Sequence, residues 1–194
     1  MVGVIILAGG ESTRIGENKA LLDFNGKPLI SYMIEKLREI NPEIIIVSSQ
    51  PQDYDFLENV HLIEDKYPDK KTVLQALYSG LLESKENDNF VCACDMPYLN
   101  INLIKYLFSL KSEFDVVIPI VEYGPVILHT IYSKSCLPVI EAHLERNSKS
   151  VKKIFRDLNV KYVPTEALQS EDSKLKSFFH IKTFLDYILV QGDL

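Results

Sequence analysis

The 194-residue chain has only three cysteines and no tryptophan. Three cysteines cannot build a dense disulfide framework, so the composition argues against a small secreted scaffold and favours a reducing compartment. Long apolar runs are also missing. Residues 1–10 are apolar, but they are too short to cross a bilayer and lack the basic start and cleavage site of a signal peptide. We therefore expect a cytoplasmic protein without a membrane partner.

Positive charge is scarce as well. The 21 Lys and Arg residues are outnumbered by 27 Asp and Glu residues, and the formal net charge is −6 at pH 7. This balance argues against proteins that coat nucleic acids, because their affinity comes from a dense basic face. An anionic ligand must therefore be held by local cations or by a metal ion. The length and the 46% hydrophobic content predict one globular domain over residues 1–194.

Short apolar runs alternate with segments of helical period along most of the chain. The expected strands are residues 2–7, 44–47, 60–63, 90–94, 116–120 and 160–163, with strand-like residues at 125–132. One helix is expected to begin after Pro28, and five more are expected at residues 73–82, 103–110, 135–144, 151–158 and 184–190. This alternation predicts an α/β three-layer sandwich with a mostly parallel sheet. We expect the C-terminal third to insert an antiparallel strand or ribbon and extend the sheet edge, with residues 169–176 as a surface loop.

A glycine-containing segment follows the first expected strand. Gly9 and Gly10 lack a Cβ, so their backbone N–H groups can approach a phosphate closely, and Arg14 and Lys19 bring positive charge to the same segment. A simple strand-to-helix turn is the alternative explanation. However, such connections usually take only about 2–6 residues, whereas residues 8–27 are expected to form one long polar loop. The segment therefore predicts a phosphate-binding site.

Two familiar phosphate motifs do not account for this segment. Gly16 is followed by Glu17, where a Walker A loop requires Lys and then Ser or Thr. The dinucleotide fingerprint also fails, because no residue separates Gly9 from Gly10. Neither motif therefore accounts for the predicted phosphate-binding segment.

A lone carboxylate follows the strand expected at residues 90–94. Asp95 stands at the carboxyl end of that strand, where ligands bind in open parallel sheets. It could simply cap the next helix, but beside a phosphate-binding loop it suits Mg²⁺, which binds through one or two carboxylates and substrate phosphates.

Cys92 and Cys94 have no second cysteine pair and are expected to be core residues. The four histidines show no metal-site spacing and are expected to be solvated or packed.

Residues 7–22, read as L-A-G-G-x-S-x-R-x-G-x-x-K-A-L-L, resemble the signature of the molybdenum cofactor guanylyltransferase family, also called molybdopterin-guanine dinucleotide biosynthesis protein A. The similarity continues in shorter stretches, namely residues 26–30, 94–97, 137–144, 150–158 and 178–183. The resemblance implies a Rossmann-like, nucleotidyltransferase-like fold. It also implies an enzyme that transfers GMP from GTP to molybdopterin, uses Mg²⁺ and releases pyrophosphate.

The resemblance also implies roles for single residues. The expected nucleotide-binding residues are Leu7, Ala8, Gly9, Gly10, Lys19, Asp65 and Asp95. The expected catalytic residues are Arg14, Lys19 and Asp95, and Asp95 is also the expected Mg²⁺ ligand. A phosphate monoester acceptor is already ionised near neutral pH, because its second pKa is about 6, so no general base is expected. Catalysis would consist of positioning and charge neutralisation, with Arg14 and Lys19 stabilising the developing pyrophosphate.

Two segments depart from the family pattern. The family usually carries Gly-Pro-Leu-Ala-Gly before its second helix, whereas residues 69–76 read D-K-K-T-V-L-Q-A; Lys70 and Lys71 either add charge there or begin a solvated helix. The family usually has Asn-x-Asn after paired phenylalanines, whereas this chain has His180 and Lys182, which favour anionic groups. His180 and Lys182 are the expected acceptor-binding residues.

These departures leave three alternatives open. The chain could be a related cytidylyltransferase, a nucleotidyltransferase with another phosphorylated acceptor, or a non-catalytic nucleotide-binding module. The expected partners are GTP and molybdopterin as substrates, with no nucleic acid. The resemblance also admits transient contact with molybdoenzymes or insertion factors.

Overall fold

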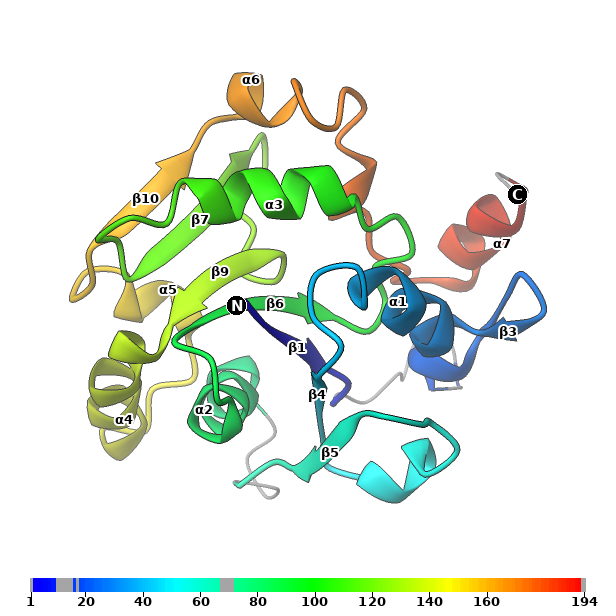
Figure 1. Cartoon of the computed structure of the whole chain (residues 1–194), viewed down its shortest axis with the longest axis horizontal. Helices are drawn as coiled ribbons and strands as arrows, with labels where there is room; N and C mark the ends of the chain where they lie inside the picture. The colour runs from blue at the N-terminus through cyan, green and yellow to red at the C-terminus, as the bar shows by residue number, and fades with distance from the viewer. Residues whose placement is uncertain (1, 10–15, 17, 67–71, 193–194) are drawn as a thin grey trace.

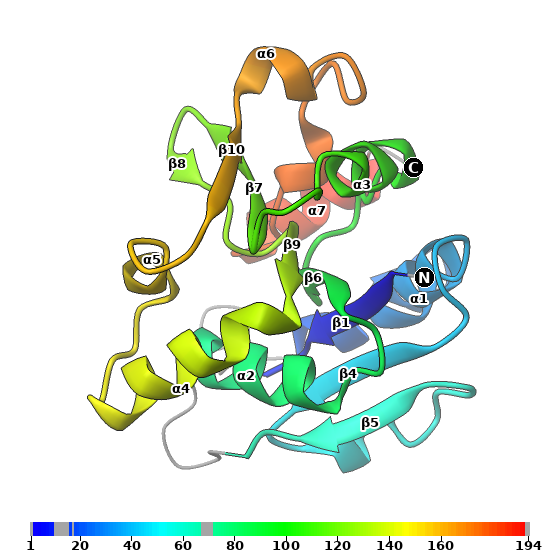
Figure 2. The ribbon, with the colours of Figure 1, turned by 60° about the vertical axis from the view of Figure 1, so that its left-hand side comes forward.

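The computed structural model describes residues 2–9, 16, 18–66 and 72–192. Its main sheet has the strand order β10-β7-β9-β6-β1-β4-β5, and β8 pairs with β7 outside this path. The strands are β1 (Gly3–Leu7), β4 (Ile44–Ser48), β5 (His61–Glu64), β6 (Asp88–Ala93), β7 (Val116–Val121), β8 (Gly124–Pro125), β9 (Thr130–Ser133) and β10 (Val160–Val163). The sheet lies between layers of helices (Figure 1 and Figure 2). The three-layer α/β prediction is therefore confirmed.

Most strand pairs in this sheet are parallel. β1 pairs in parallel with both β6 and β4, and β4–β5 and β10–β7 are parallel pairs as well. β9 lies between β6 and β7 and is antiparallel to both. The predicted antiparallel insertion and the extension of the sheet edge by β10 are therefore confirmed.

Helices cover both faces of the sheet and enclose two hydrophobic cores. The α-helices are α1 (Leu29–Leu37), α2 (Val73–Glu83), α3 (Ile101–Ser109), α4 (Leu137–Glu145), α5 (Val151–Ile154), α6 (Thr165–Leu168) and α7 (Phe184–Gly192). The first core contains the buried faces of α1 and α3, and the second contains those of α2, α4 and α5. Along β1, successive side chains enter different cores, because neighbouring residues of a strand point to opposite faces.

Helix α2 lies unusually close to β1. A Cβ at Gly80 would come within 2.7 Å of the Ile5 Cγ2 atom. Any larger residue at this position would have to push α2 away from the sheet or displace Ile5. Glycine at position 80 therefore sets the spacing between α2 and the strands that lead to the sheet's carboxyl edge.

The predicted long polar loop over residues 8–27 is wrong in its second half. That half contains a 3-10 helix (Lys19–Leu21) and a two-stranded hairpin of β2 (Asp23–Phe24) and β3 (Lys27–Pro28). The reason is that Ala20, Leu22 and Phe24 are buried in the first core, so this part of the segment is anchored rather than solvated. Helix α7 packs beside the hairpin, since the hydroxyl of Tyr187 donates to the Asp23 carbonyl at 3.0 Å.

Two further expectations required correction. The strand-like stretch 125–132 is interrupted, because the chain crosses from β7 to β6: the Val126 N–H bonds the Pro119 carbonyl and the His129 N–H bonds the Val91 carbonyl. The helix expected at residues 151–158 ends at Ile154, after which the Asp157 N–H closes a turn on the Ile154 carbonyl.

None of the helices in the described residues combines the length and the apolar composition that a membrane-spanning helix needs. The single-domain assignment stays a prediction.

Candidate active site

The carboxyl ends of β1, β5 and β6 bring three predicted site segments to one edge of the sheet. The Cys94 N–H donates to the Leu7 carbonyl at 3.2 Å, which holds the residues after β6 beside the end of β1. On the other side, the Asp65 N–H donates to the Ser48 carbonyl at 3.0 Å. Open parallel sheets bind their ligands at this edge. The backbone therefore places Asp65 and Asp95 where the sequence predicted them.

Asp95 is held between two basic side chains from distant parts of the chain. Lys19 Nζ lies 3.1 Å from Asp95 Oδ2, and His180 Nδ1 lies 2.7 Å from Asp95 Oδ1. Burial disfavours the charged form of Asp95, but the hydrogen bonds and charges of His180 and Lys19 outweigh it and hold the pKa of Asp95 below its usual value. Asp95 is therefore an anion near neutral pH, and it is the centre of a compact charged cluster.

Lys19 owes its position to a partly buried hydrogen-bond network. Asn18 caps the 3-10 helix that begins at Lys19, because its Oδ1 accepts the Ala20 N–H at 3.1 Å. The Asn18 amide also donates to the hydroxyl of Tyr54 at 3.1 Å, and that hydroxyl donates to the Ala8 carbonyl at 3.1 Å. Tyr54 is fully buried, and burial raises its pKa to about 12, so it stays a neutral hydrogen-bonding residue. The network joins the base of the Lys19 segment to the end of β1.

A small cavity opens beside the end of β1. Its volume is about 150 Å³, and its walls are Leu7, Gly9, Val47, Ser48, Ser49, Asp65, Thr72, Val73 and Ala76. Asp65 is buried, and its Oδ1 atom accepts a hydrogen bond from the Ser79 hydroxyl at 3.0 Å. Thr72 begins α2 with a capping box that it shares with Gln75. The cavity therefore joins the glycine segment to Asp65 and to the first turn of α2.

A larger cavity of about 600 Å³ adjoins the Asp95 cluster, because His180 forms part of its wall. Its walls combine aromatic and basic side chains, namely Tyr98, Tyr123, Lys174, Leu175, Lys176, Phe178, Phe179, His180, Lys182, Asp186, Leu189 and Val190. The rings of Tyr98 and Phe179 lie 5.9 Å apart, and Lys176 Nζ lies 5.0 Å from the Tyr98 ring. His180 lines this cavity and also bonds Asp95, so it connects the cavity to the charged cluster.

The predicted site residues fall into three groups. Lys19, Asp95 and His180 are in contact, and Lys182 lines the same cavity as His180. Leu7, Gly9 and Asp65 line the smaller cavity, whereas the Ala8 carbonyl bonds the Tyr54 hydroxyl. Gly10, Arg14, Lys70 and Lys71 lie outside the described residues. The structure shows where the other predicted residues lie, and the roles predicted for all of them stay predictions.

Several site residues were not found from the sequence. Ser48, Ser79, Tyr98, Tyr123, Lys174 and Lys176 belong to no motif, and only the packing of distant elements brings them to the site. Cys92 is fully buried and Cys94 packs against the same core, as predicted. Burial raises the pKa of the Cys94 thiol to about 12, so this thiol stays protonated and is a poor nucleophile.

Among the described residues, no group of three or more His, Cys, Asp or Glu side chains gathers to hold a metal ion. A single ionised carboxylate such as Asp95 fits Mg²⁺, which takes one or two carboxylates and completes its shell with substrate phosphates and water. Asp95 therefore fits such an ion, and the use of Mg²⁺ stays a prediction.

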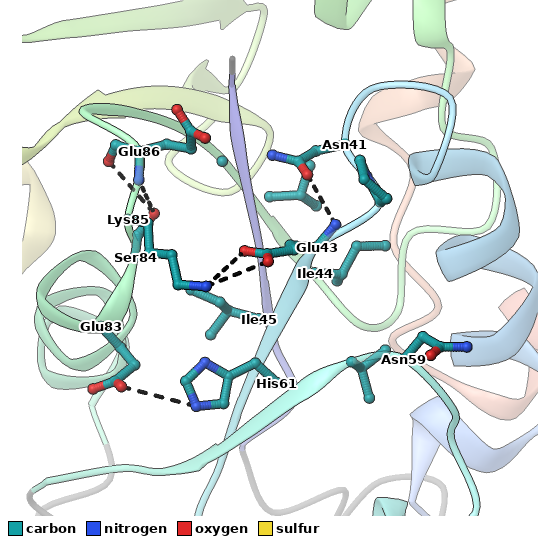
Figure 3. Close-up of a pocket in the computed structure, with 14 residues that line it drawn as sticks. Asn41, Glu43, Ile44, Ile45, Asn59, His61, Glu83, Ser84, Lys85 and Glu86 are labelled. Carbon is teal, nitrogen blue, oxygen red and sulfur yellow. Dashed lines mark hydrogen bonds and ion pairs between the residues drawn. The ribbon is translucent and has the colours of Figure 1, made fainter.

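The opposite edge of the sheet carries a groove of about 550 Å³ (Figure 3). Four of its side chains lie in pairs: Lys85 with Glu43 at 3.3 Å, and His61 with Glu83 at 3.8 Å. All four are well exposed to solvent, so these pairs contribute little to stability, and the opposite charges of Lys85 and Glu43 offset one another toward a ligand. We therefore assign the site to the carboxyl edge.

A family model described as a MobA-like NTP transferase domain matches residues 4–163. The chain belongs to this family. A molybdenum cofactor guanylyltransferase from Desulfosudis oleivorans is 33% identical over 181 residues, which cover 92% of this chain and 89% of the relative. The predicted family is therefore confirmed.

Solved structures agree with this assignment. Molybdopterin-guanine dinucleotide biosynthesis protein A from Archaeoglobus fulgidus shares 25% identity and a TM-score of 0.87, with 99% of this chain and 98% of that chain covered. The 2-C-methyl-D-erythritol 4-phosphate cytidylyltransferase from Thermus thermophilus shares 13% identity and a TM-score of 0.73, with 98% and 97% covered, which is a likeness of fold. The MobA-like family thus carries the nucleotidyltransferase-like fold predicted from the sequence.

Proposed function

We propose that this MobA-like protein transfers GMP from GTP to molybdopterin and releases pyrophosphate. The observation that carries the proposal is the Asp95 cluster, in which Lys19 and His180 hold an ionised carboxylate at the carboxyl edge of the sheet. The smaller cavity lies at the same edge of the sheet, where Leu7 in its wall accepts the Cys94 N–H, and the larger cavity adjoins the cluster through His180. Two cavities beside one charged cluster suit a reaction that joins two bound substrates.

The smaller cavity suits the nucleotide. Gly9 offers backbone close to a ligand, because it carries no Cβ, and Asp65 offers a buried carboxylate oxygen for hydroxyl or amino groups. Lys19 stands at the same edge of the sheet, and its ammonium group would bind the triphosphate. Gly10 and Arg14, which the family resemblance adds to this set, complete the proposed nucleotide-binding loop.

The larger cavity suits the acceptor. Tyr98 and Phe179 offer rings against which a planar pterin can pack, and Lys176 and Lys182 offer charge for its phosphate. His180 would orient the acceptor phosphate toward the Asp95 cluster, since it lines the cavity and bonds Asp95. The reaction then needs no general base from the protein, because the acceptor phosphate is already ionised near neutral pH.

The chemistry is a direct nucleotidyl transfer. An oxygen of the acceptor phosphate attacks the α-phosphorus of GTP and forms a new P–O–P bond. The bond from the α-phosphorus to the β-bridging oxygen breaks, and pyrophosphate leaves with its electrons. Lys19 would stabilise the charge on this leaving group. Mg²⁺ held by Asp95 would neutralise charge on the triphosphate when it is bound.

A pyrophosphate-release assay followed by ³¹P NMR tests this proposal. Release should require GTP, Mg²⁺ and molybdopterin together, and a guanine dinucleotide signal should appear in step with it. Replacing GTP by CTP in the same assay separates the cytidylyltransferase alternative. If pyrophosphate is released from GTP only with a different phosphorylated acceptor, that acceptor would replace molybdopterin in the proposal.

A second candidate is a nucleotidyltransferase with another phosphorylated acceptor. The basic residues Lys174, Lys176 and Lys182 favour it, because they line the acceptor-side cavity in a chain that lacks the usual Asn-x-Asn. The non-catalytic alternative predicts GTP binding without turnover under every acceptor. The cytoplasmic location and the transient contact with molybdoenzymes or insertion factors stay predictions.

A further inference from the structure

Asp65 stands at a junction between β5 and α2. It follows the last residue of β5, lies in the wall of the smaller cavity and is only 7% exposed. Its backbone is tied to the sheet through the hydrogen bond from the Asp65 N–H to the Ser48 carbonyl. The orientation of its carboxylate depends on the hydrogen-bond partners of the side chain.

Ser79 meets that carboxylate from the middle of α2. The Ser79 hydroxyl lies 3.0 Å from Asp65 Oδ1 and 3.0 Å from the Gln75 carbonyl, and it accepts the Lys66 N–H at 3.1 Å. Because a hydroxyl has one proton, Ser79 donates either to Asp65 or to Gln75, while its lone pair holds Lys66. Ser79 is 1% exposed, so these bonds form away from competing water.

The reach of Ser79 depends on the close approach of α2 to the sheet. Gly80, the next residue, allows this approach because it carries no Cβ against Ile5. The same helix presents Val73 and Ala76 to the smaller cavity, and its capping residue Thr72 lies in the same wall. One helix therefore supplies both part of the cavity wall and the hydroxyl that holds Asp65.

We propose that Ser79 is a positioning residue for nucleotide binding, which holds the Asp65 carboxylate and the Lys66 backbone in the orientation that the nucleotide requires. Ser79 is not part of the cavity wall and acts only through Asp65 and the turn after β5. The inference rests on the proposed function, in which Asp65 contacts the nucleotide.

The test is the Kd for GTP of the full chain, measured by isothermal titration calorimetry, together with kcat and the KM for GTP. Ser79→Ala removes the hydroxyl and should weaken GTP binding about 5- to 10-fold, the effect expected from one lost hydrogen bond of ordinary strength. KM should rise by a similar factor while kcat stays nearly constant, because Ser79 touches neither the Asp95 cluster nor the acceptor-side cavity. Ser79→Cys keeps the volume with a weaker donor and should give an intermediate Kd.

Ser84→Ala is the matched control. Ser84, labelled in Figure 3, caps the C-terminal end of the same helix at the opposite edge of the sheet and is 4% exposed. Its hydroxyl bonds Asn89. This variant should lower the melting temperature as Ser79→Ala does, but it should leave the Kd for GTP unchanged. An equal change of Kd in both variants would mean that Ser79 acts through general stability, and the inference would be wrong.

A double-mutant cycle with Asp65→Ala separates the inference from the proposed function. If Ser79 acts through Asp65, Ser79→Ala should add less than about a 2-fold change in the Asp65→Ala background. Full additivity would overturn the positioning role while leaving the proposed function intact. If Asp65→Ala itself binds GTP like the unmodified chain, the proposed role of Asp65 fails, and the inference fails with it.

Discussion

His180 Nδ1 lies 2.7 Å from Asp95 Oδ1, although 85 residues separate the two in the chain. The contact is supported by the backbone, since the Ile181 N–H donates to the Asp95 carbonyl at 2.9 Å. The C-terminal segment is thereby fastened to the carboxyl end of β6, and the wall of the acceptor-side cavity is fastened with it. A histidine predicted to bind the acceptor is therefore also a neighbour of the predicted metal ligand.

Asp95→Asn should reduce turnover by about 100-fold or more. The substitution keeps the shape of the side chain but removes the anionic charge that suits a divalent cation and pairs with Lys19. Pyrophosphate release at saturating GTP and molybdopterin measures the effect. Asp157→Asn is the control, because Asp157 is an exposed carboxylate that pairs with His143 away from the site. Unchanged turnover in Asp95→Asn would remove Asp95 from the proposed chemistry.

Lys182→Ala should raise the KM for the acceptor about 3- to 10-fold and leave the Kd for GTP unchanged. Lys182 lines the acceptor-side cavity and not the smaller one, so its charge acts on only one of the two substrates. Steady-state kinetics with varied molybdopterin checks the first part, and calorimetry with GTP checks the second. Lys105→Ala on α3 is a control with the same charge change outside both cavities. A loss of GTP affinity in Lys182→Ala would contradict the assignment of the two cavities.

His129 should make the fold less stable as the pH falls. His129 is fully buried, its ring packs between Phe90 and Phe178, and neither ring nitrogen has a hydrogen-bond partner among the described residues. Burial lowers its pKa to about 3, with smaller effects of Asp172, which raises the pKa, and His180, which lowers it. The unfolded chain binds the proton more readily, so this contribution to stability is complete above about pH 6.5 and is lost progressively toward pH 3.

His129→Leu should remove this pH dependence. Between pH 7.5 and pH 5, the unmodified chain should lose about 2 kcal/mol more of its free energy of unfolding than the variant does. Urea denaturation of both proteins at these two pH values measures the difference in the free energy of unfolding. Ser84→Ala, which removes no titratable group, should lose as much stability between the two pH values as the unmodified chain. If His129→Leu loses that much as well, His129 is not held in a buried neutral state.

Gly80→Ala should destabilise the protein by about 1–3 kcal/mol, because the added methyl group would overlap Ile5 in a packed core. Gly192→Ala is the matched control, since a Cβ at Gly192 meets nothing within 4 Å. Chemical denaturation of both variants measures the difference. The Kd for GTP should also rise in Gly80→Ala, because displacing α2 would move Ser79 away from Asp65. An equally stable Gly80→Ala variant would show that α2 has room to shift.

The amino-acid sequence by itself determined the order of strands and helices, the parallel core of the sheet and the family. These follow from local information: apolar runs such as residues 44–47 form buried strands, and the glycine segment with Arg14 and Lys19 carries a recognisable signature. The location of Asp95 at the carboxyl edge of the sheet could be predicted for the same reason, because Asp95 follows a buried strand.

Only the tertiary structure decided which side chains meet. The contact of His180 with Asp95, the hydrogen bond of Ser79 to Asp65 and the packing of Phe24 against Tyr32 of α1 all join residues whose pairing no periodicity records. The physical reason is that local patterns specify which face of an element is buried, whereas pairing of distant side chains depends on how closely the elements pack. At Gly80 that spacing rests on the absence of a single Cβ, and the position of Ser79 follows from it.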